Sequence, residues 1–279
     1  MIEQRSEQIS VEAMCEVLDV SPSGYYASRN RDVSEHDKRD VVLGEAVERV
    51  FIESRRTYGS DRVHQQLRRE GIRTSRKRVA RLMRERGLRS VRARKRGKSL
   101  TRTGDHAYIV PNLLQQDFSA TAIHQKWVTD TTYVATQEGW LYLVSVMDLY
   151  SRQIVGWAMG DHHDAALATA ALDMAIRRQR PEPGLILHSD RGTEFANARF
   201  HQRAQAAQIK LSMSSTGNSY DNASAESVFA TIKLEAIQAH VFETRQQARQ
   251  VLFDYIEVFY NRQRLHSGIG YDCPISYAA

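Results

Sequence analysis

The sequence predicts an all-helical N-terminal region followed by an α/β domain with a mixed five-stranded sheet. Three observations support this fold class. The chain of 279 residues is long enough for two or three domains. Its apolar residues recur every three or four positions up to about residue 90, as in amphipathic helices. Beyond about residue 123 they alternate or form short runs, which is typical of strands.

The first helices are indicated by their caps and apolar spacing. Residues 11–29 predict a small pair of helices, with Ser21 as N-cap and Pro22 as the first helical residue of the second. A longer helix is predicted over 37–54. Its apolar positions are Val41, Val42, Ala46, Val47, Val50 and Phe51.

Two short helices follow and suggest a helix-turn-helix. Ser60 is the predicted N-cap of a helix that ends at Gly71, and Ser75 is the predicted N-cap of one that ends at Gly87. The second, SRKRVARLMRERG, has one apolar face and carries five arginines and Lys77. Two short helices with a tight glycine-containing link are typical of this DNA-binding motif.

The charge of this region points to nucleic acid. The whole chain has a net charge of +6, but residues 55–102 contain 19 Lys or Arg and three acids, a local charge of +16. Positive side chains at this density repel one another unless a polyanion is nearby. An ordinary solvated helix is the alternative, but charges of nearly one sign favour DNA. The candidate DNA-binding residues here are Arg76, Lys77, Arg78, Arg81, Arg84, Arg94, Lys95 and Arg96.

After a linker over 105–122, the α/β elements follow in a recognisable order. Strands are predicted at 127–134, 139–151 and 152–160, a helix at 164–180, a strand at 185–190, a helix at 195–208 and a strand at 209–214. A helix over 221–238 and a long amphipathic helix over 244–261 complete the chain. Three antiparallel strands, then helix, strand, helix and strand describe a ribonuclease-H-like core.

Three acids stand out in this core. Asp130 lies inside the first strand, where an acid is disfavoured, Asp190 ends the fourth strand, and Glu226 lies on the helix of 221–238. In a ribonuclease-H-like sheet the first and fourth strands are neighbours, so we expect the acids to converge. Each could singly be a surface or turn residue, but their joint placement argues against that.

Three converging carboxylates raise one another's pKa unless a cation neutralises them. Oxygen ligands suit Mg²⁺ or Mn²⁺, and two such ions can clamp the attacking and leaving oxygens of a phosphodiester displacement. The three acids together therefore predict an enzyme of phosphoryl transfer.

The motifs also carry a family resemblance. Asp190 and Glu226 are separated by 35 residues, and Lys233 follows seven residues after Glu226. This spacing resembles the D,D(35)E signature of retroviral integrases and bacterial transposases. WVTDTTYV, LYLVSVMDLYSRQIVGW, HSDRGTEF, SYDNASAES and FATIKLE resemble the second-frame (OrfB) transposases of insertion sequences, as do TYGSDRVHQQLRREG, RKRVARLMRERGL and YNRQRLHSGIGYDCPISY. Nearly the whole chain is covered.

The resemblance implies DNA cleavage at element ends and joining of a 3′ hydroxyl to another phosphodiester. It implies that Asp130, Asp190 and Glu226 are metal-binding catalytic acids and that Lys233 contacts DNA. It further implies a homo-oligomer on double-stranded DNA and a first-frame partner or fusion. Because residues 1–40 have no sustained heptads, we expect the unfused product. A ribonuclease-H-fold nuclease or resolvase, or a non-catalytic repressor, remains the alternative.

Several residues near the acids have two interpretations. Arg191 could hold a phosphate or pair with Glu194, and Asn222 could touch DNA or start a helix. Gly192 could bring the backbone close to a metal or phosphate, or simply form a turn. Asp148 could lie near the site but is expected to be structural, and His266 could face DNA but is expected to make a helix-end hydrogen bond. The segment 215–222 is expected to be a mobile loop that orders when DNA or metal binds. Trp127, Trp140 and Trp157 are expected in the core, with base stacking as the alternative.

The remaining expectations concern organisation and location. The predicted units are 1–36, an N-terminal helical segment; 37–104, the basic helix-turn-helix-like region; 105–122, the linker; 123–240, the catalytic core; and 241–279, its C-terminal helical extension. No apolar run is long enough for a membrane span. The N-terminus lacks the apolar stretch of a signal peptide, and the two cysteines, Cys15 and Cys273, are expected to be reduced. We therefore predict a cytoplasmic bacterial protein that is associated with the nucleoid when it is bound to DNA.

Overall fold

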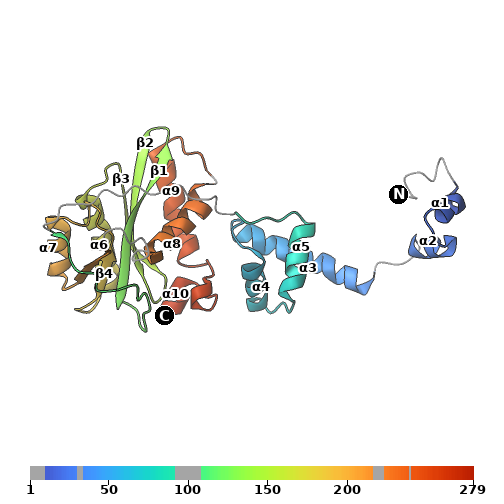
Figure 1. The fold of residues 1–279 in the computed structure, drawn as a ribbon, viewed down its shortest axis with the longest axis horizontal. Coiled ribbons are helices and arrows are strands. Elements are labelled where there is room, and N and C mark those ends of the chain that lie inside the picture. The colour runs from blue at the N-terminus through green and yellow to red at the C-terminus, as the bar shows by residue number, and fades with distance from the viewer. Residues whose placement is uncertain (1–9, 30–33, 92–107, 216–222, 239) are drawn as a thin grey trace.

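The computed structural model describes residues 10–29, 34–91, 108–215, 223–238 and 240–279 (Figure 1). At the N-terminal end, α1 (Val11–Val17) and α2 (Pro22–Arg29) form the predicted helix pair. The backbone N–H of Gly24 donates to Ser21 Oγ at 3.0 Å, so Ser21 caps a helix that begins at Pro22. Both predictions for this segment are confirmed.

Three helices form the basic bundle: α3 (Glu35–Glu53), α4 (Ser60–Arg69) and α5 (Arg76–Glu85). Ser75 caps α5 as predicted, by accepting from the N–H of Arg78. The prediction for Ser60 was wrong by one position, because Gly59 is the N-cap and makes no side-chain cap bond. Gly71 and Gly87 follow α4 and α5 with φ of 82° and 67°, the left-handed conformation that ends many helices.

The apolar face of α3 differs from the predicted one. Val47, Val50 and Phe51 are buried as expected, but Val41 and Val42 are 54% and 69% exposed. Leu43 takes the inward position in that turn. With 3.6 residues per turn, positions 43, 47, 50 and 51 share a face that 41 and 42 do not.

The sheet is mixed and has the order β3-β2-β1-β4-β5. Its strands are β1 (Lys126–Thr136), β2 (Gly139–Asp148), β3 (Ile154–Gly160), β4 (Ile186–Ser189) and β5 (Lys210–Met213). The first three are antiparallel, and β4 joins β1 in parallel, with Val128 opposite His188. The predicted ribonuclease-H-like arrangement, with first and fourth strands adjacent, is confirmed.

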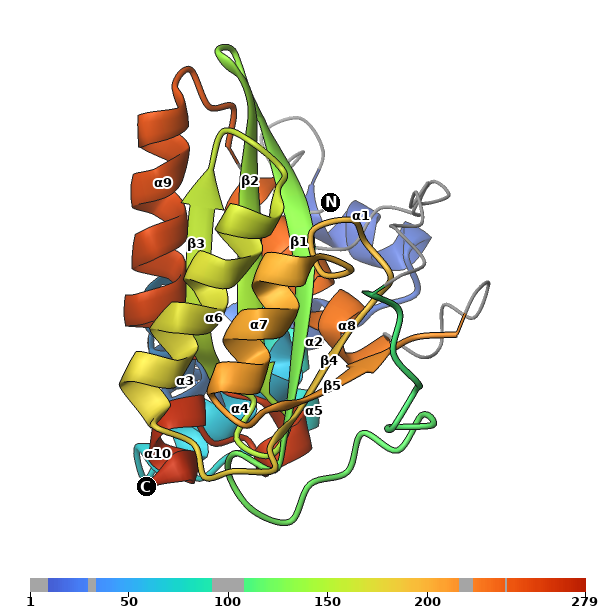
Figure 2. The same cartoon turned by 90° about the vertical axis from the view of Figure 1, so that its left-hand side faces the viewer.

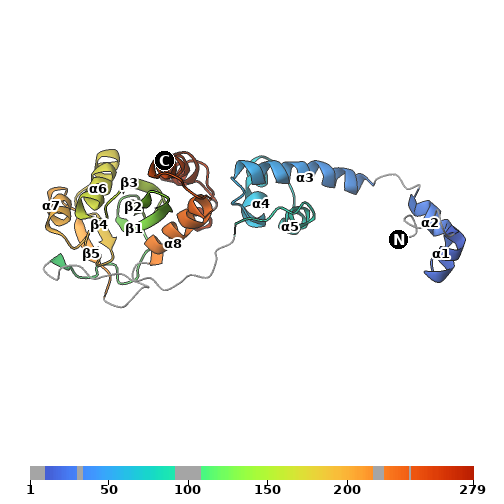
Figure 3. The same ribbon diagram turned by 90° about the horizontal axis from the view of Figure 1, so that it is seen from above.

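Helices cover both faces of the sheet (Figures 2 and 3). On one face, α6 (Ala165–Gln179) and α7 (Ala198–Ala206) pack with Trp127 and Val144. On the other, α8 (Ala223–Ile232) and α9 (Arg245–Phe253) pack with Val128 and Leu143. Because successive strand side chains point to opposite faces, neighbours such as Trp127 and Val128 enter different cores.

The two C-terminal helices continue as π-helical turns. The helix α8 runs into η3 (Lys233–Ile237), and α9 runs into η4 (Asp254–Tyr260). A short 3₁₀ turn, η5 (Ser267–Ile269), and α10 (Pro274–Ala278) end the chain. The amphipathic pattern predicted both helices, but not the change of hydrogen-bond register within them.

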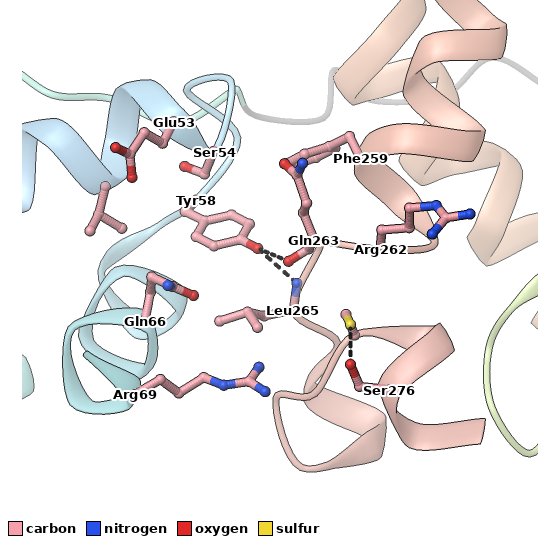
Figure 4. Close-up of a pocket in the computed structure, with 12 residues that line it drawn as sticks. Glu53, Ser54, Tyr58, Gln66, Arg69, Phe259, Arg262, Gln263, Leu265 and Ser276 are labelled. Carbon is pink, nitrogen blue, oxygen red and sulfur yellow. Dashed lines mark hydrogen bonds between the residues drawn. The ribbon is translucent and has the colours of Figure 1, made fainter. Parts of the chain in front are cut away.

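The basic bundle is docked on these C-terminal helices. The hydroxyl of Tyr58 donates to the carbonyl of Gln263 at 3.2 Å and accepts from the N–H of Leu265 at 2.7 Å (Figure 4). Arg55 pairs with Asp254 at 2.6 Å, and Arg69 with Asp272 at 2.7 Å. The bundle and the core share one continuous apolar cluster. A cavity of about 390 Å³ lies between them, lined by residues of both, such as Tyr58 and Phe259.

The part of the predicted linker that the structure describes follows the sheet edge. The N–H of Leu113 donates to Ser212 Oγ at 2.8 Å, and Leu114 is buried. None of the described helices is long and apolar enough to span a membrane. Cys15 and Cys273 are both buried and free, as expected.

Candidate active site

The first two acids meet where β1 and β4 run side by side. Asp130 lies two residues beyond Val128, the last residue of β1 that pairs with β4, and Asp190 directly follows the end of β4. Each carboxylate is oriented by a nearby backbone amide. The N–H of Thr131 donates to Asp130 Oδ1 at 2.7 Å, and the N–H of Gly192 donates to Asp190 Oδ1 at 2.9 Å. The parallel pairing therefore brings together two residues that are sixty positions apart.

The electrostatics of the two acids reflect this proximity. Burial, reinforced by the negative charges of Asp190, Glu194 and Glu226, raises the pKa of Asp130 to about 8. Burial and the charges of Glu194 and Glu226 raise the pKa of Asp190 to about 6. Because ionising both carboxyl groups is costly here, a bound cation would stabilise their charged forms.

The third acid, Glu226, lies in the first turn of α8. Its charge acts on both aspartates, so all three predicted acids share one electrostatic environment. In the described part of the chain no three Asp, Glu, His or Cys side chains already stand in a metal-binding arrangement.

A fourth acid, Glu194, was missed as a site residue. It is 4% exposed, and its Oε1 accepts from Thr131 Oγ1 at 2.7 Å and contacts His163 Nε2 at 2.6 Å. Burial alone raises its pKa, but the bonds from His163 and Thr131 outweigh burial and lower it. Its Oε2 is buried without a hydrogen-bond partner among the described residues. The sequence around it gave no clear signal, because the burial of Glu194 depends on contacts with His163 and Thr131 from other elements.

Gly192 has a definite steric role. A Cβ at this position would lie 2.4 Å from Glu194 Oε2 and 3.0 Å from Asp190 Oδ1. Gly192 also begins a turn, because the N–H groups of Phe195 and Ala196 donate to its carbonyl at 3.1 and 2.9 Å. The turn interpretation is therefore supported, and an approach to a metal or phosphate stays a prediction.

The flanking residues are held mainly by structural bonds. Arg191 Nε donates to the carbonyl of Ser214 at 2.7 Å. Asp148 is fully buried and accepts from the N–H of His124 at 2.9 Å and from both the N–H and the hydroxyl of Ser151 at 2.8 Å. Its expected structural role is confirmed. His266 is also structural: its backbone bonds Asp272, and its ring lies beside Arg264 and Tyr260.

The three tryptophans do not behave alike. Trp127 is fully buried, as expected, and Trp157 is partly buried, with its Nε1 donating to Glu257 at 2.7 Å. Trp140 is 49% exposed, so its assignment to the core was wrong. It is the second residue of β2, opposite Ala135 near the turn of the β1–β2 hairpin.

The predicted DNA-binding residues divide into several groups. Arg76 pairs with Asp61, while Arg78 and Arg81 both pair with Asp40, within the bundle. Lys77 and Arg84 form no ion pair with any described residue. Lys233 Nζ lies 5.2 Å from the ring centre of Tyr133. The predictions for Arg94, Lys95, Arg96, Asn222 and the loop 216–222 fall outside the described residues.

Comparisons with known proteins agree with this geometry. Family models described as "Integrase core domain" match residues 120–219 and 207–274, and one described as "HTH-like domain" matches residues 38–96. The chain is 42% identical to an uncharacterized 31 kDa protein of insertion element IS600 from Shigella sonnei, over 95% of this chain and 97% of that protein. It is 39% identical to transposase InsF of insertion sequence IS3A from Escherichia coli K12, over 96% and 94%.

A similar solved structure is the catalytic core domain of HTLV-2 integrase in complex with magnesium. The identity is 16%, with 57% of this chain and 98% of that chain covered and a TM-score of 0.40.

Proposed function

Since this chain belongs to the insertion-sequence transposases with an integrase core domain, we propose that Asp130, Asp190 and Glu226 catalyse its DNA cleavage and strand transfer. The observation that carries this assignment is the mutual electrostatic influence of three acids from β1, the end of β4 and α8. A structural role leaves unexplained why the fold raises the pKa of Asp130 to about 8.

The donor set fits divalent metal ions. All three side chains offer carboxylate oxygens, the ligands that Mg²⁺ and Mn²⁺ prefer. The raised pKa values of Asp130 and Asp190 mean that a bound cation recovers free energy that burial and repulsion cost. We propose Mg²⁺ or Mn²⁺, with two ions per site. When bound, they supply charge neutralisation and Lewis-acid assistance at the phosphodiester.

The chain's own residues orient the acids for this task. The amides of Thr131 and Gly192 fix one oxygen of each aspartate. Glu194 ties Thr131, next to Asp130, to His163, which precedes α6, and so braces β1 against a second element. In the reaction a water or a DNA 3′ hydroxyl displaces the 3′ oxygen of a phosphodiester in line, so one P–O bond forms as another breaks.

We propose that the bundle of α3–α5 and the tail beyond it bind double-stranded DNA. Lys77, Arg84, Arg94, Lys95 and Arg96 are the cations we assign to phosphates there, with Lys233, Arg191 and Asn222 nearer the acids. We keep the domain limits 1–36, 37–104, 105–122, 123–240 and 241–279 as our proposal. Joining two element ends requires at least two active sites, so the working form is a homo-oligomer on DNA, with a first-frame protein as a further partner.

The assignment is tested by strand transfer. The substrate is a duplex that carries the ends of the insertion sequence encoding this chain, with Mg²⁺ or Mn²⁺. We expect Asp190→Asn to lose joining yet keep DNA binding, because binding depends on the basic bundle. Asp173→Asn, which alters an acid paired with Arg203 on the outer helices, should keep both. Joining by the Asp190 variant at the wild-type rate would refute the assignment.

A further inference from the structure

Two large aromatic side chains near the site face solvent instead of a core. Tyr133 is 57% exposed and Trp140 is 49% exposed. Their rings lie 5.0 Å apart in a T-shaped contact, with an interplanar angle of 80°. They lie on the outer part of the β1–β2 hairpin, where β1 has passed its last pairing with β4 at Val128.

The strand register places these rings in a row on one face of the sheet. Tyr133 lies opposite Tyr142, and Ala135 lies opposite Trp140, so Tyr133, Tyr142 and Trp140 share one face of the sheet. Tyr142 in turn stacks on His163, with ring centres 5.4 Å apart and an interplanar angle of 15°. We call Trp140, Tyr133 and Tyr142 the aromatic row.

The row ends next to the proposed catalytic acids. His163 contacts Glu194, which is bonded to Thr131, the neighbour of Asp130. Tyr133 is three residues beyond Asp130 on β1, about 10 Å along an extended strand, and its side chain points to the opposite face. Beyond Val128 the edge of β1 is no longer paired with β4, and Lys233 of η3 reaches the ring of Tyr133 there. A DNA strand that passes round this edge therefore reaches both the acids and the row.

The charges around the row suit nucleic acid. Lys233 Nζ lies 5.2 Å from the ring centre of Tyr133. Arg245 Nε donates to the carbonyl of Trp140 at 3.0 Å and also lies 3.8 Å from Asp161, so Lys233 is the main cation beside the rings. Exposed rings beside cations are the arrangement that single-stranded DNA-binding surfaces use, because bases stack on the rings and phosphates meet the cations. A purely apolar partner surface would leave these cations desolvated.

We propose that Trp140 and Tyr133 form a stacking platform for an unstacked base of the DNA strand held at Asp130, Asp190 and Glu226. This inference rests on the proposed function and names a subsite of it. The platform recognises the aromatic face that every base has, so it binds without sequence preference. It fixes the strand beside the scissile phosphate and leaves recognition of the element ends to the bundle.

The test measures binding of the full-length protein to a fluorescently labelled single strand of twelve thymidines. We expect Tyr133→Ala and Trp140→Ala each to weaken binding about tenfold, and Tyr133→Phe and Trp140→Phe to restore it, because stacking needs only a ring. Phe253→Ala is the matched control, since Phe253 is 50% exposed on α9 outside the row and should bind as wild type.

The possible results separate the platform from the proposed function and from a protein–protein contact. Wild-type binding by both alanine variants overturns the platform, while the proposed function stands if Asp190→Asn still fails to join strands. Equal weakening by Phe253→Ala also overturns it, because any exposed ring would then act. If the alanine variants change the oligomeric state in gel filtration but not single-strand binding, the row contacts a second copy of the chain and the platform is wrong.

Discussion

At the scale of single residues, Gly192 lies where a methyl group has no room. We predict that Gly192→Ala lowers strand transfer about 10- to 100-fold, because the new Cβ would displace the carboxylates of Glu194 and Asp190. The overpacking should also cost about 1–3 kcal/mol of unfolding free energy, measured in urea. Gly268→Ala is the control, since no atom lies within 4 Å of the corresponding Cβ. Full activity of the Gly192 variant would contradict the steric argument.

His266 carries a second residue-scale prediction. Burial, with the positive charges of Arg264, Arg62 and Arg152, lowers its pKa to about 2, whereas an unfolded histidine titrates near ~6.5. Below that pH the unfolded chain binds a proton at His266 that the folded chain does not. The free energy of unfolding therefore falls as the pH is lowered through 6.5, by up to about 1.4 kcal/mol per pH unit from this group.

We expect His266→Gln to flatten this pH dependence between pH 7.5 and 5.5, measured as urea midpoints. The exposed His240 serves as control, and His240→Gln should keep the wild-type dependence. An unchanged profile in the His266 variant would show that the ring ionises in the folded protein.

The sequence singled out Asp130, Asp190 and Glu226 as candidates, because an acid is unusual inside a strand and the spacing of the other two resembles the D,D(35)E signature. It did not reveal Glu194, whose burial depends on His163 and Thr131, residues from separate strands and loops. It also misplaced Trp140, because an apolar residue in a strand does not reveal where the covering helix ends. Pairwise burial of this kind comes from tertiary packing, which local patterns do not record.

At the scale of elements, the helix that carries Glu226 is fixed through its π-helical continuation. Glu235 of η3 receives two bonds of 2.7 Å from Arg264, and both side chains are about 95% buried. The hydroxyl of Tyr255 donates to Glu235 at 2.7 Å, and Arg62 of the bundle lies 3.9 Å away. The pair therefore links α8, the C-terminal helices and the basic bundle.

We predict that Arg264→Leu destabilises the protein by about 3–5 kcal/mol, because it leaves Glu235 buried without its main partner. The double variant Glu235→Leu with Arg264→Leu should recover much of that loss, since no charge remains buried. Urea unfolding measures both. If the double variant were no more stable than the single variant, the destabilisation would come from lost packing and not from the unpaired charge of Glu235.

Element types were predictable and some boundaries were not. All five strands and the main helices lie where apolar periodicity or short apolar runs placed them. The long elements repeat their pattern several times, and the four-residue β4 and β5 were recognised by short runs between helices. The helix expected from residue 195 begins only at Ala198, since Phe195 and Ala196 are buried in the preceding turn. The exposed Val41 and Val42 show a similar limit of the sequence. Apolar residues alone allow two choices for the buried face of a helix, and only the neighbouring helices decide between them.

At the scale of the whole molecule, the positive charge of the bundle serves two surfaces. Arg55, Arg62 and Arg69 face acids of the C-terminal region, whereas Lys77 and Arg84 have no acidic partner among the described residues. Composition alone assigned all of this charge to DNA. The structure shows that part of it docks the bundle on the core.

We predict that the double variant Lys77→Ala with Arg84→Ala flattens the salt dependence of duplex binding, by roughly 0.9 in the log–log slope per lost phosphate contact. Arg69→Ala should leave the slope unchanged, because Asp272 already neutralises that side chain. Fluorescence anisotropy across a salt series measures both. A slope reduced only by the Arg69 variant would place the DNA on the docking face.

The order of elements along the chain also has a consequence for synthesis. The helices α3–α5 are complete within the first 85 residues, and their contacts with one another are local. Asp130 is made next, but β4 and α8 emerge only some sixty and one hundred residues later. On the proposed function, the DNA-binding bundle is therefore synthesised before the last of the catalytic acids, whereas the helices on which it docks are synthesised last.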